Sequence, residues 1–197
     1  YTGTIEFSEK IENVIKDSNQ NLDNIIIPGF IDLHCHGGNG FDVMGGLSSI
    51  LEFSKYHLKN GTTTLLPTTL TGTLKDTIHS LAGLNNYTEK NKNLTNILGV
   101  HLEGPFINPK KLGAQPACAQ KPNIDFINKV SLEAQIKVIT LAPELENSEI
   151  FIKNLIEKNI KVQIGHSLAS FDCCKKIMKN FKIGFTHLYN AMSGNHH

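Results

Sequence analysis

Five side chains stand out because their types and positions suit the binding of metal ions. His34 and His36 follow an apolar run and are separated by one residue, so on a β-strand both imidazoles point to the same face. Glu103, His166 and His187 each follow a short apolar or β-branched stretch of their own. A carboxylate with several imidazoles is typical of catalytic zinc and iron(II) sites. The set predicts a metal centre, and five ligands fit two bridged ions better than one.

These residues become neighbours only if the elements that carry them form one parallel sheet. Strand-like and helical stretches alternate at a spacing of roughly 30 residues, which is the signature of βα units. We expect strands at 31–36, 62–66, 96–102, 136–141, 161–165 and 183–187. Because the carboxyl ends of the strands meet at one face of a (β/α)8 barrel, the candidate ligands are expected to converge there.

A doubly wound sheet is the alternative closure of an α/β protein. Its dinucleotide-binding form requires Gly-x-Gly-x-x-Gly after the first strand, with the third glycine opening a helix. The glycines at 37–40 lead instead into Phe41 and Asp42. The TIM barrel is therefore favoured over the doubly wound sheet.

The chain divides into two parts. Residues 1–24 are polar with weak alternation, and we expect them to belong to a small β domain or to a leader. Residues 25–197 are expected to form about six βα units of a barrel that binds metal. Since a whole barrel takes about 250 residues, the remaining units are expected beyond this chain.

Local signals predict how several elements begin and end. Ser49 and Glu52 have the spacing of a capping box, and Thr73 is placed to cap the following helix. The strand that starts at 62 is expected to stop at Pro67. Residues 105–121 contain several prolines and no periodicity, and a loop of that length in a compact domain is usually functional.

The remaining histidines and Cys35 are expected to have other roles. His101 lies one step deeper than the candidate ligand Glu103, so it is expected to pack behind the site. His57 and His79 fall on predicted helices and are expected at the surface, whereas Cys35 is expected in the core. The roles of His196 and His197 stay open.

Composition narrows the partners and the location. The 197 residues carry a formal net charge of +1 without a basic run, which argues against nucleic acid as a partner. The longest apolar stretches are far shorter than the ~18 residues that span a bilayer, and no signal-peptide pattern is evident. The four cysteines contain no CxxC pair, so reduced thiols and a cytoplasmic location are expected.

The motifs around the candidate ligands resemble those of the amidohydrolase superfamily. Residues 28–37, Pro-Gly-Phe-Ile-Asp-Leu-His-Cys-His-Gly, are similar to its first-strand signature. Five further motifs resemble the N-acetylglucosamine-6-phosphate deacetylase family: His101-Leu-Glu-Gly-Pro-Phe-Ile-Asn108, Lys111-Leu-Gly-Ala114, Leu141-Ala-Pro-Glu144, Gly165-His-Ser167 and Thr186-His-Leu-Tyr-Asn-Ala-Met192.

The resemblance implies a metal-dependent hydrolase that converts N-acetyl-D-glucosamine 6-phosphate into D-glucosamine 6-phosphate and acetate. It implies a core metal site of Glu103, His166 and His187. Family members that keep the pair matching His34 and His36 use it for a second metal, so one or two divalent ions, zinc or iron, are expected.

The resemblance also implies that Ala114, Asn190 and Ala191 contact the amino sugar and that the full-length protein is a homodimer. The family's phosphate-binding arginine and catalytic aspartate would lie beyond residue 197, so no catalytic acid–base residue is assigned in this chain. Three alternatives stay open: a deaminase or cyclic amidase of the same superfamily, a non-catalytic metal-binding barrel, or an inactive fragment.

Overall fold

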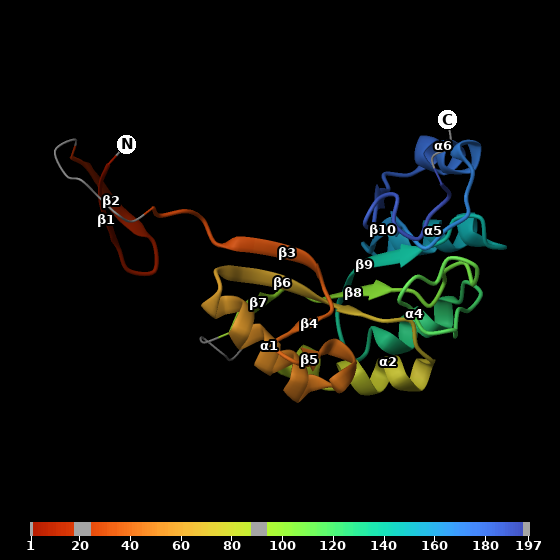
Figure 1. Cartoon of the computed structure of the whole chain (residues 1–197), viewed down its shortest axis with the longest axis horizontal. Helices are drawn as coiled ribbons and strands as arrows, with labels where there is room; N and C mark the ends of the chain where they lie inside the picture. Colours follow the sequence, from red (N-terminus) through yellow and green to blue (C-terminus); the bar gives the residue numbers. More distant parts are fainter. Residues whose placement is uncertain (1, 18–24, 88–93, 195–197) are drawn as a thin grey trace.

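The computed structural model describes residues 2–17, 25–87 and 94–194. An antiparallel hairpin of β1 (Gly3–Phe7) and β2 (Ile11–Lys16) stands apart from the rest of the chain (Figure 1). All six residues of β2 are exposed. The hairpin therefore contributes nothing to the main core among the described residues.

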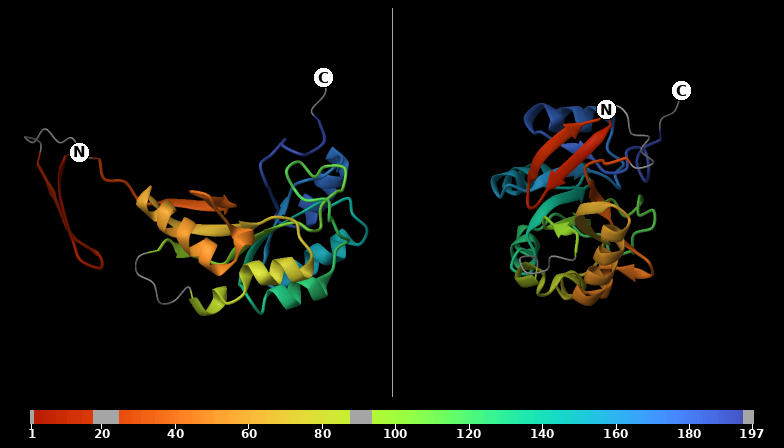
Figure 2. Two further views of the ribbon diagram at one scale, coloured as in Figure 1. Left: turned by 60° about the horizontal axis from the view of Figure 1, so that its bottom comes forward. Right: turned by 90° about the vertical axis from the view of Figure 1, so that its left-hand side faces the viewer.

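The main body is a curved parallel sheet whose spatial order follows the chain. Its neighbouring strands are β3 (Phe30–Cys35), β6 (Thr62–Thr69), β8 (Val100–Glu103), β9 (Ile136–Leu141), β10 (Lys161–Ile164) and β11 (Gly184–Phe185). A short strand, β7 (Asn96–Ile97), pairs with β6 beside this path. Parallel strands joined in chain order and curled in this way form about half of a (β/α)8 barrel (Figure 2), which confirms the predicted fold.

Helices follow most of the strands, and α1, α2 and α4 lie along one side of the sheet (Figure 1). The helices are α1 (Leu47–Lys59), α2 (Leu74–Leu81), α3 (Leu84–Tyr87), α4 (Ile124–Val130), α5 (Ser148–Glu157) and α6 (Phe171–Asn180). A small hairpin, β4 (Gly37–Gly38) and β5 (Phe41–Asp42), and a 3-10 turn, η1 (Val43–Gly45), precede α1.

The core lies between the sheet and these helices. Phe53 of α1 and Leu65 of β6 are fully buried. Phe106, the third residue after β8, packs edge-to-face against Phe126 and Phe151, with ring centroids 5.4 and 4.9 Å apart. This aromatic cluster anchors the start of the long loop at 105–121 to α4 and α5.

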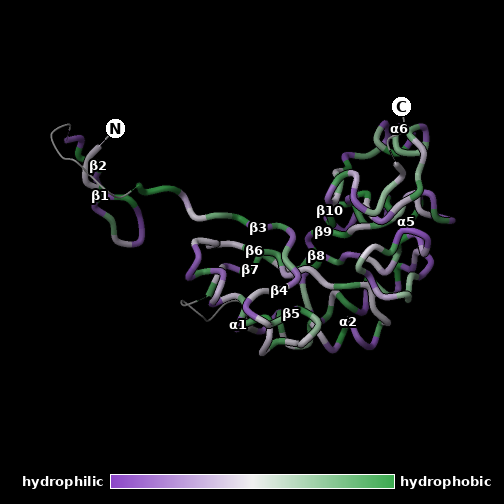
Figure 3. Tube along the Cα trace, viewed as in Figure 1, coloured by the Kyte–Doolittle hydropathy of each residue, from purple (hydrophilic) through white to green (hydrophobic). Residues whose placement is uncertain are grey.

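The edge at β3 is apolar and open to solvent. The segment leading into β3 is strongly hydrophobic (Figure 3), and Ile25 is 88% exposed. Ile31 and Leu33 of β3 are exposed as well. A closed barrel has no such edge, so these side chains mark where the half barrel of this chain lacks a neighbouring strand.

Several of the predicted boundaries are wrong. The strand expected at 96–102 is two short strands, β7 and β8, because residues 98–99 belong to neither. The strand starting at 62 does not stop at Pro67 but runs to Thr69. The register against β3 shifts between Asp32 and Cys35, and Thr68 Oγ1 accepts the hydrogen bond from Cys35 N at 2.9 Å. The missing N–H of Pro67 therefore interrupts no regular ladder there.

The capping box at Ser49 is also wrong. Helix α1 begins at Leu47, so Ser49 lies inside its first turn. The Ser49 hydroxyl instead donates to Asp42 O at 2.7 Å and accepts from Asp42 N at 2.9 Å. The cap predicted at Thr73 is confirmed, because Asp76 N donates to Thr73 Oγ1 and Thr73 N donates to Asp76 Oδ2, each at 3.2 Å.

Candidate metal centre

The five candidate ligands come from four strands and meet around one buried carboxylate. Glu103, the last residue of β8, is 1% exposed. Its Oε1 lies 2.8 Å from His187 Nε2, 3.2 Å from His166 Nε2 and 3.8 Å from His34 Nε2. Its Oε2 lies 2.9 Å from His36 Nε2. The carboxylate thus stands between the His34–His36 pair and the His166–His187 pair.

The arrangement forms two groups of potential ligands that share Glu103. One consists of His34, His36 and Glu103, and the other of Glu103, His166 and His187, with ligand atoms within 4.8 Å of one another in each. A tetrahedral ion about 2.0–2.1 Å from its ligands separates them by about 3.3 Å. Small adjustments of the three close atoms in the second group would therefore admit an ion.

The second ring nitrogens of two histidines also suit metal binding. His166 Nδ1 lies 2.8 Å from Lys111 O, and His36 Nδ1 lies 2.9 Å from Thr68 O. A carbonyl can only accept, so both rings carry a proton on Nδ1, and Nε2, which faces Glu103, is the nitrogen that can bind a metal ion once it is unprotonated. This is the orientation that metal-binding histidines ordinarily have.

His187 is held less completely than His166. Its Nε2 faces Glu103 Oε1 and lies 3.1 Å from His166 Nε2. Its Nδ1 is buried and has no hydrogen-bond partner among the described residues. Among the described residues, the polar contacts of this ring are therefore those made by Nε2.

Electrostatics around Glu103 favour its charged form. Burial by itself would raise the pKa of Glu103, but hydrogen bonds from His166 and His36 hold that pKa well below its usual range. Burial lowers the pKa of both imidazoles, and the Glu103 charge outweighs it, so the pKa values of His36 and His166 are raised. Burial dominates at His34 and lowers its pKa. Glu103 is thus an anion ready to neutralise bound cations.

His101 lies behind the centre, as expected. It is 1% exposed, and its Nε2 lies 2.7 Å from Thr140 Oγ1. Its Nδ1 lies 3.2 Å from Leu33 O and 3.4 Å from His34 Nδ1. Burial lowers the pKa of His101 to about 4, so the ring is neutral and supports the position of His34.

His57 is not the solvated surface residue that its helix position predicted. It is half-buried, and its Nε2 lies 3.2 Å from both Gly37 O and Cys35 Sγ. The tertiary contact with the segment after β3 draws the ring inward, which the position on a helix could not indicate. His79 is exposed and Cys35 is buried, so these two predictions are confirmed.

The described residues contain a third group of potential ligands, Asp32, Cys35 and His57. Apart from the contact between Cys35 Sγ and His57 Nε2, their side chains bond to the backbone of residues 34–37. Asp32 Oδ1 accepts from His34 N at 3.0 Å, and Cys35 Sγ donates to Gly37 O at 3.3 Å. These contacts hold in place the segment that carries the two histidines of β3.

The segments predicted to contact a substrate lie together beside His166. A Cβ atom on Gly113, the neighbour of Ala114, would lie 3.4 Å from Ala191 Cβ and 3.5 Å from His166 Cε1. Ala191 O accepts from the backbone N–H of residue 167 at 3.1 Å. Ala114 and Asn190 are exposed, so both are open to a small molecule. The two histidines at 196–197 lie outside the described residues.

Gln115 is a contact of the centre that sequence reasoning missed. It is 7% exposed, and its Nε2 donates to Glu103 Oε2 at 2.7 Å. Its Oε1 accepts from Thr71 N at 2.6 Å, which fixes the direction of the amide. The only signal in the sequence was its place beside Ala114 in the loop at 105–121.

The fold and the site together define an incomplete (β/α)8 barrel with a candidate metal centre at the carboxyl ends of its strands. The sequence model of the amidohydrolase family matches residues 25–197. The chain belongs to the amidohydrolase family.

Three relatives illustrate the similarity. The N-acetylglucosamine-6-phosphate deacetylase of Bacillus subtilis (strain 168) is 34% identical over 201 residues, which is 98% of this chain and 51% of that protein. The N-acetylgalactosamine-6-phosphate deacetylase of Escherichia coli O157:H7 is 33% identical over 178 residues, 88% of this chain and 47% of that protein. The crystal structure of N-acetylglucosamine-6-phosphate deacetylase from Thermotoga maritima has a TM-score of 0.84 at 31% identity, covering 98% of this chain and 52% of that one. The chain spans about half the length of the relatives it matches.

Proposed function

We propose that the full-length protein is a metal-dependent deacetylase that hydrolyses N-acetyl-D-glucosamine 6-phosphate to D-glucosamine 6-phosphate and acetate. The observation that carries the proposal is the convergence of Glu103, His166 and His187 at the carboxyl ends of three parallel strands. The names of the relatives support the substrate class. Membership of the amidohydrolase family supports hydrolysis as the type of reaction.

The proposed ligands of the first ion are Glu103, His166 and His187. The proposed ligands of a second ion are His34 and His36, with Glu103 shared between the two. Such an ion, when bound, lowers the pKa of a coordinated water toward about 7 and polarises the amide carbonyl. Zinc and iron(II) both suit imidazole and carboxylate ligands, so we propose one of these metals.

The residues of this chain orient and enclose the reacting groups. Glu103 provides the anionic centre, and the Lys111 carbonyl holds His166 with its Nε2 directed at Glu103. We propose that Ala114, Asn190 and Ala191 contact the amino sugar, which fits the exposure of Ala114 and Asn190 and the close approach of the loops beside His166. The phosphate-binding and acid–base residues are proposed to come from the part of the protein that follows residue 197.

Three further predictions concern the whole protein. We propose that residues 1–24 belong to a small β domain, which fits the separate hairpin of β1 and β2. We also propose a homodimer in the cytoplasm, and the four free cysteines fit a reducing compartment. Among the described residues, the structure contains no helix with the length and apolarity needed to cross a membrane.

Metal analysis and acetate release by the full-length protein test the proposal. We expect bound zinc or iron and release of acetate from N-acetyl-D-glucosamine 6-phosphate, with N-acetyl-D-galactosamine 6-phosphate as the comparison substrate. The Glu103→Gln variant should lose both metal and activity. Ammonia release without acetate would favour a deaminase, and retained metal without turnover would favour a non-catalytic barrel. A Glu103→Gln variant with unchanged metal content would refute the assignment of the ligands.

A further inference from the structure

Three motif residues have no part in the metal centre as described, and the structure brings them together. Glu144 follows β9, Asn108 lies in the loop after β8, and Ser167 follows β10. Glu144 Oε1 accepts from Asn108 Nδ2 at 2.9 Å and from Leu168 N at 2.6 Å. Glu144 Oε2 accepts from Ser167 Oγ at 2.6 Å. One carboxylate therefore joins three loops at the carboxyl ends of neighbouring strands.

All three groups that face Glu144 are donors whose directions are determined by other bonds. Asn108 Oδ1 accepts from Lys110 N at 2.9 Å, so its amide nitrogen must face Glu144. Ser167 Oγ accepts from Ala169 N at 2.9 Å, so its hydrogen points toward the carboxylate. An ionised carboxylate only accepts hydrogen bonds and has room for all three donors. An amide at this position would turn a donor toward one of them.

These bonds lead to His166 along two routes. Leu168 N lies two residues beyond His166, whose backbone adopts φ of 50°, a left-handed conformation that side chains other than glycine rarely adopt. On the other side, Asn108 N donates to His166 O at 2.9 Å, and Lys111 N donates to Asn108 O at 2.9 Å. Lys111 O in turn accepts from His166 Nδ1 at 2.8 Å. Glu144 thus braces both the backbone and the ring of His166.

We propose that Glu144 is a positioning residue of the metal centre, which holds His166 in its strained backbone conformation with Nε2 directed at Glu103. The inference rests on the proposed function, because it assumes that His166 binds metal. Glu144 touches neither the ion nor the substrate in this proposal. Glu144 changes the affinity for metal only by orienting His166.

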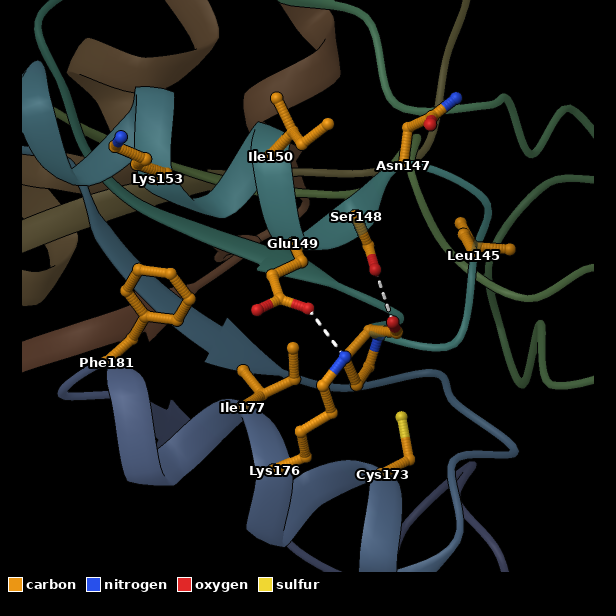
Figure 4. Close-up of a pocket in the computed structure, with 11 residues that line it drawn as sticks. Leu145, Asn147, Ser148, Glu149, Ile150, Lys153, Cys173, Lys176, Ile177 and Phe181 are labelled. Atoms are coloured by element: carbon orange, nitrogen blue, oxygen red, sulfur yellow. Dashed lines mark hydrogen bonds and ion pairs between the residues drawn. The ribbon is translucent and has the colours of Figure 1, made fainter.

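A neighbouring carboxylate provides a matched control. A groove lies between α5 and α6 (Figure 4). Pro143 and Leu145 line it, but Glu144 between them does not. Glu149 lines that groove and pairs with Lys176 at 2.8 Å, as the dashed line in Figure 4 shows. The side chain of Lys176 is 70% exposed and that of Glu149 is 42% exposed, and ion pairs so open to solvent contribute little. Glu149→Gln therefore removes a paired carboxylate from the same region without disturbing His166.

The test is zinc binding by calorimetry to the metal-free full-length protein. Outer residues that orient metal ligands typically change affinity by about 10- to 100-fold, and we expect that loss for Glu144→Ala. Glu144→Gln should show a smaller loss, because it keeps the shape and one acceptor, and it serves if the alanine variant does not fold. Glu149→Gln should bind zinc within about twofold of the wild type, as expected for an independent site.

A double variant tests whether Glu144 acts through His166. In a His166→Ala background, adding Glu144→Ala should weaken zinc binding by no more than about twofold. Unchanged affinity in both Glu144 variants overturns the inference, and so does an equal loss with and without His166. These outcomes are separate from a failure of the proposed function, which would show as zinc retained by Glu103→Gln or as absence of acetate release.

Discussion

Replacing Gln115 by leucine tests how strongly the centre depends on a buried amide. Gln115 is 7% exposed and joins Thr71 N to Glu103 Oε2 through bonds of 2.6 and 2.7 Å. Leucine has a similar volume but neither bond. Gln115→Leu therefore leaves a buried N–H without its acceptor and removes one donor from a buried carboxylate.

The expected cost follows from these two losses. An unpaired buried N–H costs about 1–3 kcal/mol, and a hydrogen bond to a charged group contributes about 1.5–3 kcal/mol. The larger apolar surface that leucine buries offsets about 2 kcal/mol of this. We expect Gln115→Leu to lower the free energy of unfolding of the metal-free protein by about 0.5–4 kcal/mol, and to weaken zinc binding about 10-fold because Glu103 loses a support.

The assay is urea unfolding of the full-length protein with chelator present, followed by zinc calorimetry. Gln120→Leu is the control, because Gln120 lies in the same loop and its Nε2 donates to Gly72 O at 3.0 Å, away from the centre. A single neutral hydrogen bond contributes about 1 kcal/mol, so this control should lose no more than that. Equal losses of stability and unchanged zinc affinity in both variants would refute the role assigned to Gln115.

Four further predictions concern stability and the metal. Thr73→Ala removes the confirmed helix cap and should cost about 1 kcal/mol in urea unfolding; a change within the error of wild type would contradict the cap. Phe53→Ala should cost about 3–5 kcal/mol because the ring is fully buried, whereas Tyr56→Ala on the exposed side of the same helix should cost far less, and similar losses would contradict the assigned core. Gly113→Ala forces a side chain into φ of 56° beside the centre, which costs about 1–2 kcal/mol and should slow acetate release; unchanged activity and stability would argue against the close approach of that loop. Zinc at 100 times its dissociation constant should raise the free energy of unfolding by about 2.7 kcal/mol over the chelated protein, and no difference would mean that the folded state does not bind it.

Features that depend on residues close together in the chain could be predicted from the sequence. The alternation of strand and helix follows from periodicity, and it predicted the six parallel strands and their order, although not all of their ends. His34 and His36 share a face because side chains on a strand repeat every two residues. The cap at Thr73 needs a partner only three residues away. Each of these features is governed by neighbours along the chain.

Features that depend on contacts between distant loops could not be predicted from the sequence. Ser49 has the spacing of a capping box, yet Asp42 from the preceding hairpin engages its hydroxyl and the helix starts earlier. His57 turns inward because the segment after β3 offers it a carbonyl. In both cases a contact made by folding outweighs a local preference.

The metal centre shows the same division. The residue types of its five candidate ligands and their places at strand ends were evident from the sequence, since parallel strands bring their carboxyl ends to one side. The bonds of Gln115 and Glu144 were not, because their partners lie in other segments of the chain, 12 to 44 residues away for Gln115. The sequence around a polar side chain does not indicate which distant residue it will bond to. Only the curvature of the sheet, which brings these loops together, determines which donors each of them meets.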